Sequence, residues 1–160
     1  MYRYKPQKYT KAHIVIPVFM ILLCACALVC SSLGQLIPPA IMQFVAVLCA
    51  ALAIQVISRY SLTCYTYEAD EDKRVFSVYK AVGKKSQLVA AIEYSAIISV
   101  DKKEKDYSPK RKYNKAYKIH NFCANIYPPE AYCLVCDIEG NDIAVMIEAD
   151  KTLLEMLERR

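Results

Sequence analysis

Four residues toward the C-terminal end of the chain have the types and spacing of a metal site. His120 and Cys123 are followed by Cys133 and Cys136, and imidazole and thiolate pairs of this kind are usual ligands of tetrahedral zinc. Residues 132–138, however, alternate in the manner of a β-strand, so we expect Cys133 and Cys136 on opposite faces, with Cys136 in the core and Cys133 partly exposed. We therefore expect no metal and no other cofactor. A zinc or thiol sensor that uses these four residues stays as an alternative function.

Residues 102–118 form a second candidate site, because lysine and arginine are dense there and tyrosines are interleaved with them. Such charges suit an acidic partner surface or anionic lipid, to which each cation near a membrane is attracted by about 1 kcal/mol. A solvated loop that only keeps the domain soluble explains the same composition. The residues expected to make contact are Lys102, Lys103, Lys105, Lys110, Arg111 and Lys112, with Lys115 and Lys118 beyond them and Tyr107, Tyr113 and Tyr117 in between.

Other chemistry finds little support in the sequence. The chain has no glycine-rich phosphate loop, no serine or cysteine nucleophile with a convincing histidine partner, and no paired carboxylates on a defined scaffold. Its two histidines, His13 and His120, offer little acid-base capacity. No nucleic-acid-binding motif accompanies the basic residues. We expect neither an enzyme nor a nucleic-acid partner.

The elements that must position these residues begin with an apolar hairpin. No charged residue lies between Lys11 and Arg59, and within this interval residues 14–33 and 40–57 are apolar runs, each long enough for a helix to cross a hydrocarbon layer about 30 Å thick. The sequence predicts a transmembrane helical hairpin over residues 13–58. A cleaved secretion signal is an alternative for the first run, but that run continues past Cys26 and a second one follows at once.

Charge is distributed unevenly around this hairpin. The arm of residues 1–12 contains Arg3, Lys5, Lys8 and Lys11 and no acid, whereas the link between the two runs is uncharged. Because basic residues stay on the cytoplasmic side, we expect both termini in the cytoplasm and a multi-pass location in the cell membrane. All eight cysteines are then expected as free thiols, four of them inside the spans and four in a reducing compartment.

Small residues at three- and four-residue spacing predict the seam inside the hairpin, because they let two helices approach closely. They are Cys24, Ala27 and Ser31 in the first run and Ala46, Ala50 and Ala53 in the second. The second run also contains Gln43 and Gln55. These amides suit packing or oligomer contacts rather than a transport path, since no intramembrane charge accompanies them.

After residue 58 the pattern changes to the period of two that strands show. Asp150 can cap a final helix whose apolar stripe is Leu153, Leu154 and Leu157. Residues 59–160 are long enough for one small domain with its own core. Seven strands are predicted, over residues 60–68, 74–80, 87–92, 97–101, 115–123, 132–138 and 143–148, with a long loop over residues 102–114.

Seven antiparallel strands closed by one amphipathic helix are the arrangement of a pleckstrin-homology-like (PH-like) barrel. Two spans followed by YSLTCYTYEADEDKRVFSVYKAVGKKSQLVAAIEYSAIISVDK (residues 60–102), and a tail running YCLVCDIEGNDIAVMIEADKTLLEMLERR (residues 132–160), resemble the bacterial PH-like membrane proteins. The resemblance implies an α+β fold, in which a two-helix transmembrane hairpin precedes a mainly antiparallel seven-stranded PH-like barrel with a C-terminal amphipathic helix. It implies a cytoplasmic membrane face and no reaction.

The function expected from these features is a membrane-anchored, non-catalytic binding or scaffolding module. Its expected partners are the lipid bilayer, another membrane or cytoplasmic protein, and anionic lipid. An accessory subunit of a membrane transport or secretion complex is the remaining alternative, with Gln43 and Gln55 as contact residues.

Overall fold

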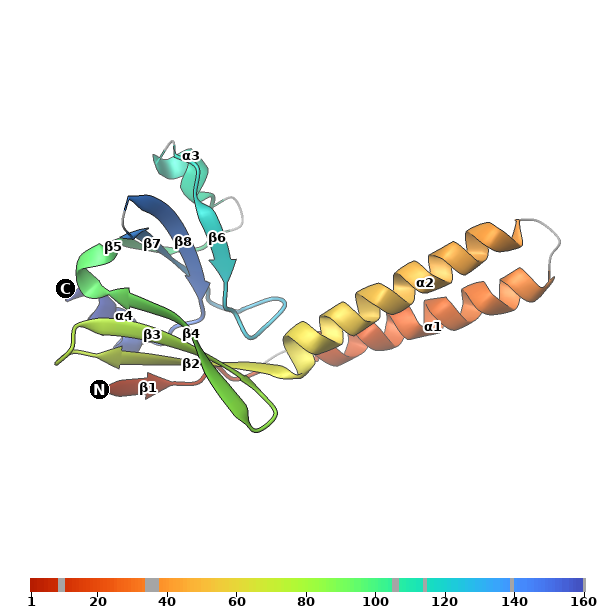
Figure 1. Ribbon diagram of the computed structural model, residues 1–160, viewed down its shortest axis with the longest axis horizontal. Helices are drawn as coiled ribbons and strands as arrows, with labels where there is room; N and C mark the ends of the chain where they lie inside the picture. The colour runs from red at the N-terminus through yellow and green to blue at the C-terminus, as the bar shows by residue number, and fades with distance from the viewer. Residues whose placement is uncertain (9–10, 34–37, 105–106, 114, 139, 160) are drawn as a thin grey trace. The chain divides into compact units, whose positions relative to one another are not determined.

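The computed structural model describes residues 1–8, 11–33, 38–104, 107–113, 115–138 and 140–159 of the chain (Figure 1). The chain divides into two compact units. One is a helical hairpin of Thr10–Thr63, and the other is a sheet domain that combines Met1–Tyr9 with Cys64–Arg160. Each unit has its own interior and is built from a different kind of element.

The helical unit consists of α1 (Ala12–Leu33) and α2 (Pro39–Val56), and one π-helical turn, η1 (Ile57–Ser61), continues α2. Both helices are long and apolar enough to cross a membrane, which confirms the two apolar helices expected from the sequence. Proline stands at the first turn of α2, where its missing N–H group has no helical partner to lose. The ends of the hairpin meet where the Ser61 hydroxyl donates a hydrogen bond to the His13 carbonyl (2.9 Å).

Small side chains form the seam between α1 and α2. Ala27, Ala46 and Ala53 are buried, and Cys24 and Ala50 are half-buried. Small side chains let the two helix backbones approach closely, and the large apolar side chains are left on the outside of the pair. The predicted seam is confirmed at these positions.

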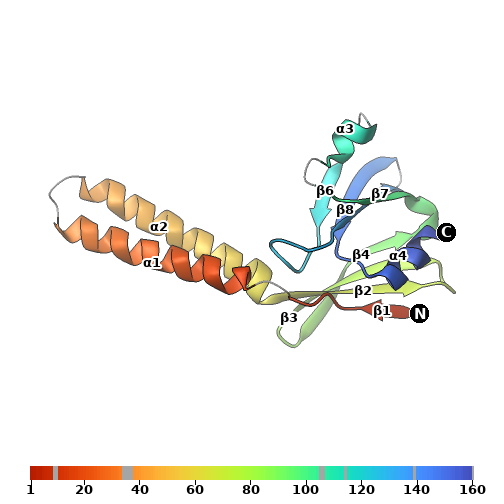
Figure 2. The same cartoon turned by 180° about the vertical axis from the view of Figure 1, so that it is seen from behind.

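The sheet domain contains two four-stranded sheets (Figures 1 and 2). The first has the order β1-β2-β3-β4 and the second the order β5-β7-β8-β6. The strands are β1 (Tyr2–Tyr4), β2 (Thr63–Asp70), β3 (Val75–Val82), β4 (Lys85–Glu93), β5 (Ile97–Lys102), β6 (Lys118–Asn121), β7 (Tyr132–Ile138) and β8 (Asn141–Ile147). Short helices η2 (Tyr94–Ala96), α3 (Pro109–Tyr113) and α4 (Lys151–Glu158) complete the domain.

The predicted seven-stranded antiparallel barrel needs three corrections. The structure describes an eighth strand, because Tyr2–Tyr4 of the basic arm pairs antiparallel with Tyr67–Ala69. Strand β6 runs parallel to β8 rather than antiparallel to a neighbour in sequence. The described strands pair within two separate sheets, and neither sheet closes on itself. What holds is the coarser expectation of an α+β chain with two helices followed by mainly antiparallel sheets.

Helix α4 lies against the core that the two sheets share. Leu153 and Leu157 are fully buried among residues of both sheets, including Phe76 of β3 and Leu134 of β7, and Leu154 is half-buried. The Asp150 carboxylate caps the helix by accepting a hydrogen bond from the Leu153 N–H (2.9 Å). The predicted cap and apolar stripe of this helix are therefore confirmed.

Candidate partner-contact site

The basic segment expected as a loop covers the outer face of the second sheet. We call residues 103–117 the cover segment; residues 105, 106 and 114 within it lie outside the described part. Its tyrosines Tyr107, Tyr113 and Tyr117 pack against a buried cluster that lines this face. The cluster consists of Cys123, Ala131, Cys133, Val135, Ala144 and Met146. The aromatic rings therefore serve as the inner side of a cover.

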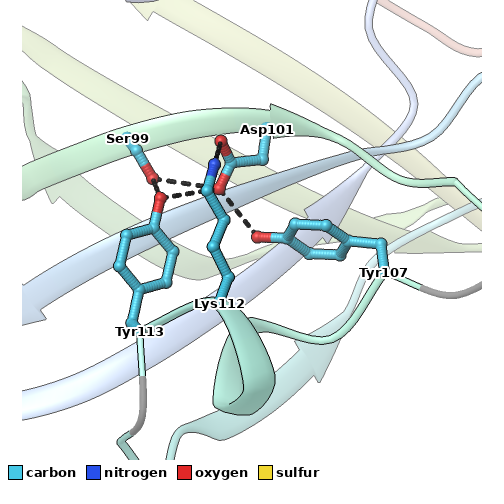
Figure 3. A network of polar contacts seen from close by, with 5 residues as sticks. All are labelled: Ser99, Asp101, Tyr107, Lys112 and Tyr113. Carbon is cyan, nitrogen blue, oxygen red and sulfur yellow. Dashed lines mark hydrogen bonds and ion pairs between the residues drawn. The ribbon is translucent and has the colours of Figure 1, made fainter.

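The Asp101 carboxylate at the end of β5 holds the cover segment in place (Figure 3). One of its oxygens, Oδ2, accepts hydrogen bonds from the hydroxyls of Tyr107 (2.8 Å), Tyr113 (2.8 Å) and Ser99 (3.2 Å). The other oxygen, Oδ1, accepts one from Lys112 Nζ (2.6 Å). Two strand residues and three cover residues thus form one polar network beneath a basic surface.

This network shifts the ionisation of its members. Burial by itself raises the pKa of Asp101, but the hydrogen bonds from Lys112, Tyr107 and Tyr113 together outweigh it, so the net pKa lies below its usual value. Burial, followed by the hydrogen bond to Asp101, raises the pKa of Tyr107. At neutral pH the carboxylate is charged and the phenol is neutral, which is the combination that the hydrogen bonds require.

The six predicted contact cations have different roles in the structure. Lys112 is bound to Asp101, and Lys102 forms an exposed ion pair with Glu130 (3.3 Å). Lys105 lies outside the described residues. The three others are exposed and have no ion pair within the described chain: Lys103, Lys110 and Arg111. Further along the chain, Lys115 pairs with Asp142.

The cysteine and histidine candidates are divided between two faces. Cys136 lies in the core between the sheets and Cys133 in the cluster under the cover segment, which confirms that they project to opposite faces of β7. The expectation that Cys133 is partly exposed is wrong, because the cover segment buries it completely and thereby raises the pKa of its thiol. Among the described residues, no group of three or more His, Cys, Asp or Glu side chains is placed to hold a metal ion.

Sequence reasoning missed Asp101 and Ser99 as the centre of this site. The available signal was an acid at the end of a predicted strand, immediately before the densest basic stretch of the chain. A carboxylate in that position pairs with one lysine and accepts hydrogen bonds from two tyrosine hydroxyls. The basic surface that remains is smaller than the composition implied.

Replacing Asp101 with asparagine should loosen the cover segment. The amide loses the charge and presents N–H groups where the carboxylate accepted several donors, and a hydrogen bond to a charged group is worth about 1.5–3 kcal/mol. We expect trypsin to cleave the full chain after Lys110 and Arg111 about tenfold faster or more. The matched control is Asp142→Asn, which removes only the partly exposed pair with Lys115; equal cleavage rates in both variants would contradict the assigned role.

The stabilising effect of Asp101 should disappear in acid. Because its folded pKa is lowered, its contribution is complete above the unfolded value of about 3.9 and is lost as pH falls through the folded pKa. NMR titration of its carboxyl carbon, in the full chain in detergent micelles, should give a midpoint below that of an ordinary aspartate. Lys112→Gln should raise this midpoint, since the Lys112 hydrogen bond is the largest influence that lowers it. A midpoint unaffected by that change would remove Lys112 from the network.

Comparison with known proteins finds no family model that matches this chain, and no similar curated protein or solved structure. The PH-like expectation thus gains no support from a relative.

Proposed function

We propose that this protein is a membrane-anchored, non-catalytic binding module. Helices α1 and α2 are its anchor, and the sheet domain binds another protein at the cytoplasmic face. The observation that carries the proposal is the exposure of apolar side chains along both helices. Only 6% of the most apolar window of α1 and 11% of that of α2 is buried within the described residues.

This exposure is the physical argument for a bilayer. Phe19 and Leu22 of α1 and Phe44, Val47 and Ile54 of α2 are each more than half exposed. Removing one such side chain from water is favourable by about 1.5–3 kcal/mol, and soluble monomers rarely expose apolar surface continuously over two helices. A core helix of a soluble protein has most of its apolar side chains buried. Most apolar side chains of α1 and α2 are exposed. The hydrocarbon chains of a bilayer would cover the exposed apolar side chains of both helices without another protein.

The positions of the basic residues support an orientation with both termini on the cytoplasmic side of the membrane. Lys11 and Arg59 flank the two ends of the hairpin that the Ser61–His13 hydrogen bond joins. The link at the opposite end of the hairpin, residues 34–38, has no charged residue in the sequence. The positive-inside tendency therefore favours the first end, with both termini, on the cytoplasmic side.

The contact surface proposed for the partner is the outer side of the cover segment. Lys110 and Arg111 stand on α3 and Lys103 precedes it, all exposed. The tyrosines of the cover segment, within and on both sides of α3, pack this surface against the sheet, so the cations lie on an ordered support. A fixed basic surface fits an acidic partner surface at less cost in conformational entropy than a free tail does.

A PH-like arrangement is the finer form of this proposal. Burial of Leu153 and Leu157 between the two sheets supports it. The parallel β6–β8 pair and the two unclosed sheets depart from it. The proposal depends on the anchor and the ordered basic surface, and it stands without a barrel.

The amides of α2 favour a second candidate, an accessory subunit of a membrane transport or secretion complex. Gln43 and Gln55 are both exposed on the hairpin. A polar side chain that faces lipid gains from a hydrogen-bond partner on another transmembrane helix. In this case the partner would be reached within the membrane as well as at its surface.

Membrane insertion is the first test. The full chain expressed in a bacterial host should stay in membranes after alkaline carbonate extraction. The double variant Leu22→Arg/Leu48→Arg should be extracted, since an arginine at a span centre costs about 2.5–3.5 kcal/mol on insertion scales. Leu62→Arg, at an exposed position outside both helices, is the control and should behave as the native chain. A native chain that carbonate releases would refute the anchor.

The partner surface is tested by charge reversal. Lys110→Glu/Arg111→Glu should reduce, about tenfold or more, the recovery of any protein that co-purifies with the full chain from native membranes. Lys84→Glu/Lys85→Glu makes the same change of charge at two exposed residues, one in the turn after β3 and one at the start of β4, and it should leave recovery unchanged. Equal losses in both variants would show that net charge, rather than the cover segment, attracts the partner.

A further inference from the structure

The N-terminal arm is a strap bound to the sheet domain. We call residues 2–8 the strap. Its first part, β1, pairs with β2, and the Tyr2 hydroxyl donates a hydrogen bond to Asp150, the residue that caps α4. The Arg3 guanidinium forms an ion pair with Glu68, whose side chain is almost fully buried. One of the four basic residues of the arm is therefore paired with an acid of the domain, while its own side chain stays largely exposed.

A buried polar pair fixes the other part of the strap. The Gln7 carbonyl accepts a hydrogen bond from Asn125 Nδ2 (2.8 Å). Asn125 is itself held by Glu148, whose two oxygens accept hydrogen bonds from the Asn125 backbone N–H and side-chain amide, both at 2.7 Å. Asn125 and Glu148 are each 4% exposed. Because buried polar groups are costly unless bonded, this pair holds the strap at one position.

A pocket of about 480 Å³ lies between the strap and the start of β2. Lys5, Pro6, Gln7 and Lys8 line it on the strap side, and Cys64, Tyr65 and Ala124 line it on the domain side. No acidic side chain is among the described residues that line it. Two lysines together with apolar lining residues suit a small anionic group attached to an apolar molecule, and the volume is typical of a small-ligand site.

The place of this pocket in the chain favours a lipid headgroup as its ligand. Lys8 comes shortly before Ala12, the first residue of α1, and Cys64 comes shortly after Ser61, the end of η1. When the hairpin is in a bilayer, the few residues between each wall of the pocket and the helices limit how far that wall can lie from the lipid headgroups. Headgroups are the most concentrated anions at that boundary, and anionic lipids are enriched on the cytoplasmic side.

We propose that the strap pocket binds the phosphate-bearing headgroup of an anionic phospholipid from the same bilayer. Lys5 and Lys8 contact the phosphate, and Pro6 and Tyr65 contact the apolar part of the lipid. This inference rests on the membrane anchoring proposed above. It assigns the lipid contact to the strap and leaves the basic surface of the cover segment to a protein partner.

The test uses the full chain in detergent micelles. Native mass spectrometry, with phosphatidylglycerol and phosphatidylcholine titrated in separate series, gives the affinity of the first bound lipid. The native chain should prefer phosphatidylglycerol, and Lys5→Gln/Lys8→Gln should weaken this binding about 30-fold, as expected for two cations at a membrane surface. Lys110→Gln/Arg111→Gln loses the same charge from the cover segment and should retain native affinity.

Alkylation of Cys64 locates the bound lipid. This half-buried thiol lines the pocket, so phosphatidylglycerol should slow its reaction with a maleimide in the native chain, as read by peptide mass spectrometry, and should not slow it in Lys5→Gln/Lys8→Gln. Inorganic phosphate at millimolar concentration should give no protection. Protection by inorganic phosphate alone would assign the pocket to a soluble phosphate and overturn the lipid proposal.

Two further results would overturn the inference. One is an equal affinity of the native chain for the two lipids, and the other is an equal loss of affinity in both glutamine variants. If the native chain resists carbonate extraction but shows no lipid preference, only this inference fails. If carbonate releases the chain from membranes, the anchor fails as well.

Discussion

The central constraint on the sheet domain is that strands β7 and β8 must be protected from water on both faces. In β7, Leu134 and Cys136 lie in the core between the sheets, and Cys133 and Val135 lie on the opposite face. A strand that is apolar on both sides needs two covering layers. The opposite sheet and α4 provide the inner layer. The cover segment provides the outer one, and it stays in place because Asp101 accepts hydrogen bonds from its tyrosines and from Lys112.

The same constraint determines which charges are available for binding. Burying a carboxylate is costly unless a cation or several donors satisfy it, and the domain meets this cost with its own basic residues. Arg3 pairs with the buried Glu68, and Lys112 pairs with the largely buried Asp101. Composition alone therefore overstates the basic surface. The cations without an ion pair among the described residues, such as Lys110 and Arg111, are the ones available to the partner proposed above.

Patterns of short range gave the most accurate predictions. The bounds of β7 agree with the predicted residues 132–138, and the cap of α4 is Asp150, because both depend on residues close in sequence. The start of β2 was predicted at residue 60, whereas the helical turn η1 continues to Ser61. The aromatic residue Tyr60 favours a strand, but it lies in the π-helical turn that extends α2. The burial of Cys133 could not be predicted either. The alternation of side chains in β7 does not show that residues distant in sequence, those of the cover segment, cover its outer face.

Long-range pairing explains the remaining differences from the PH-like expectation. Strand β1 has only three residues, and its contacts with β2 and Asp150 join the two ends of the chain. Strand β6 lies beside β8 although β7 follows it in sequence, so β8 stands between the two strands that this part of the chain connects. The connection between β6 and β7 therefore returns along the end of β8, where Asn125 bonds to Glu148. Because Asn125 also holds Gln7, the connection that follows the parallel strand also fixes the strap. This connection also contributes Ala124 to the lining of the strap pocket.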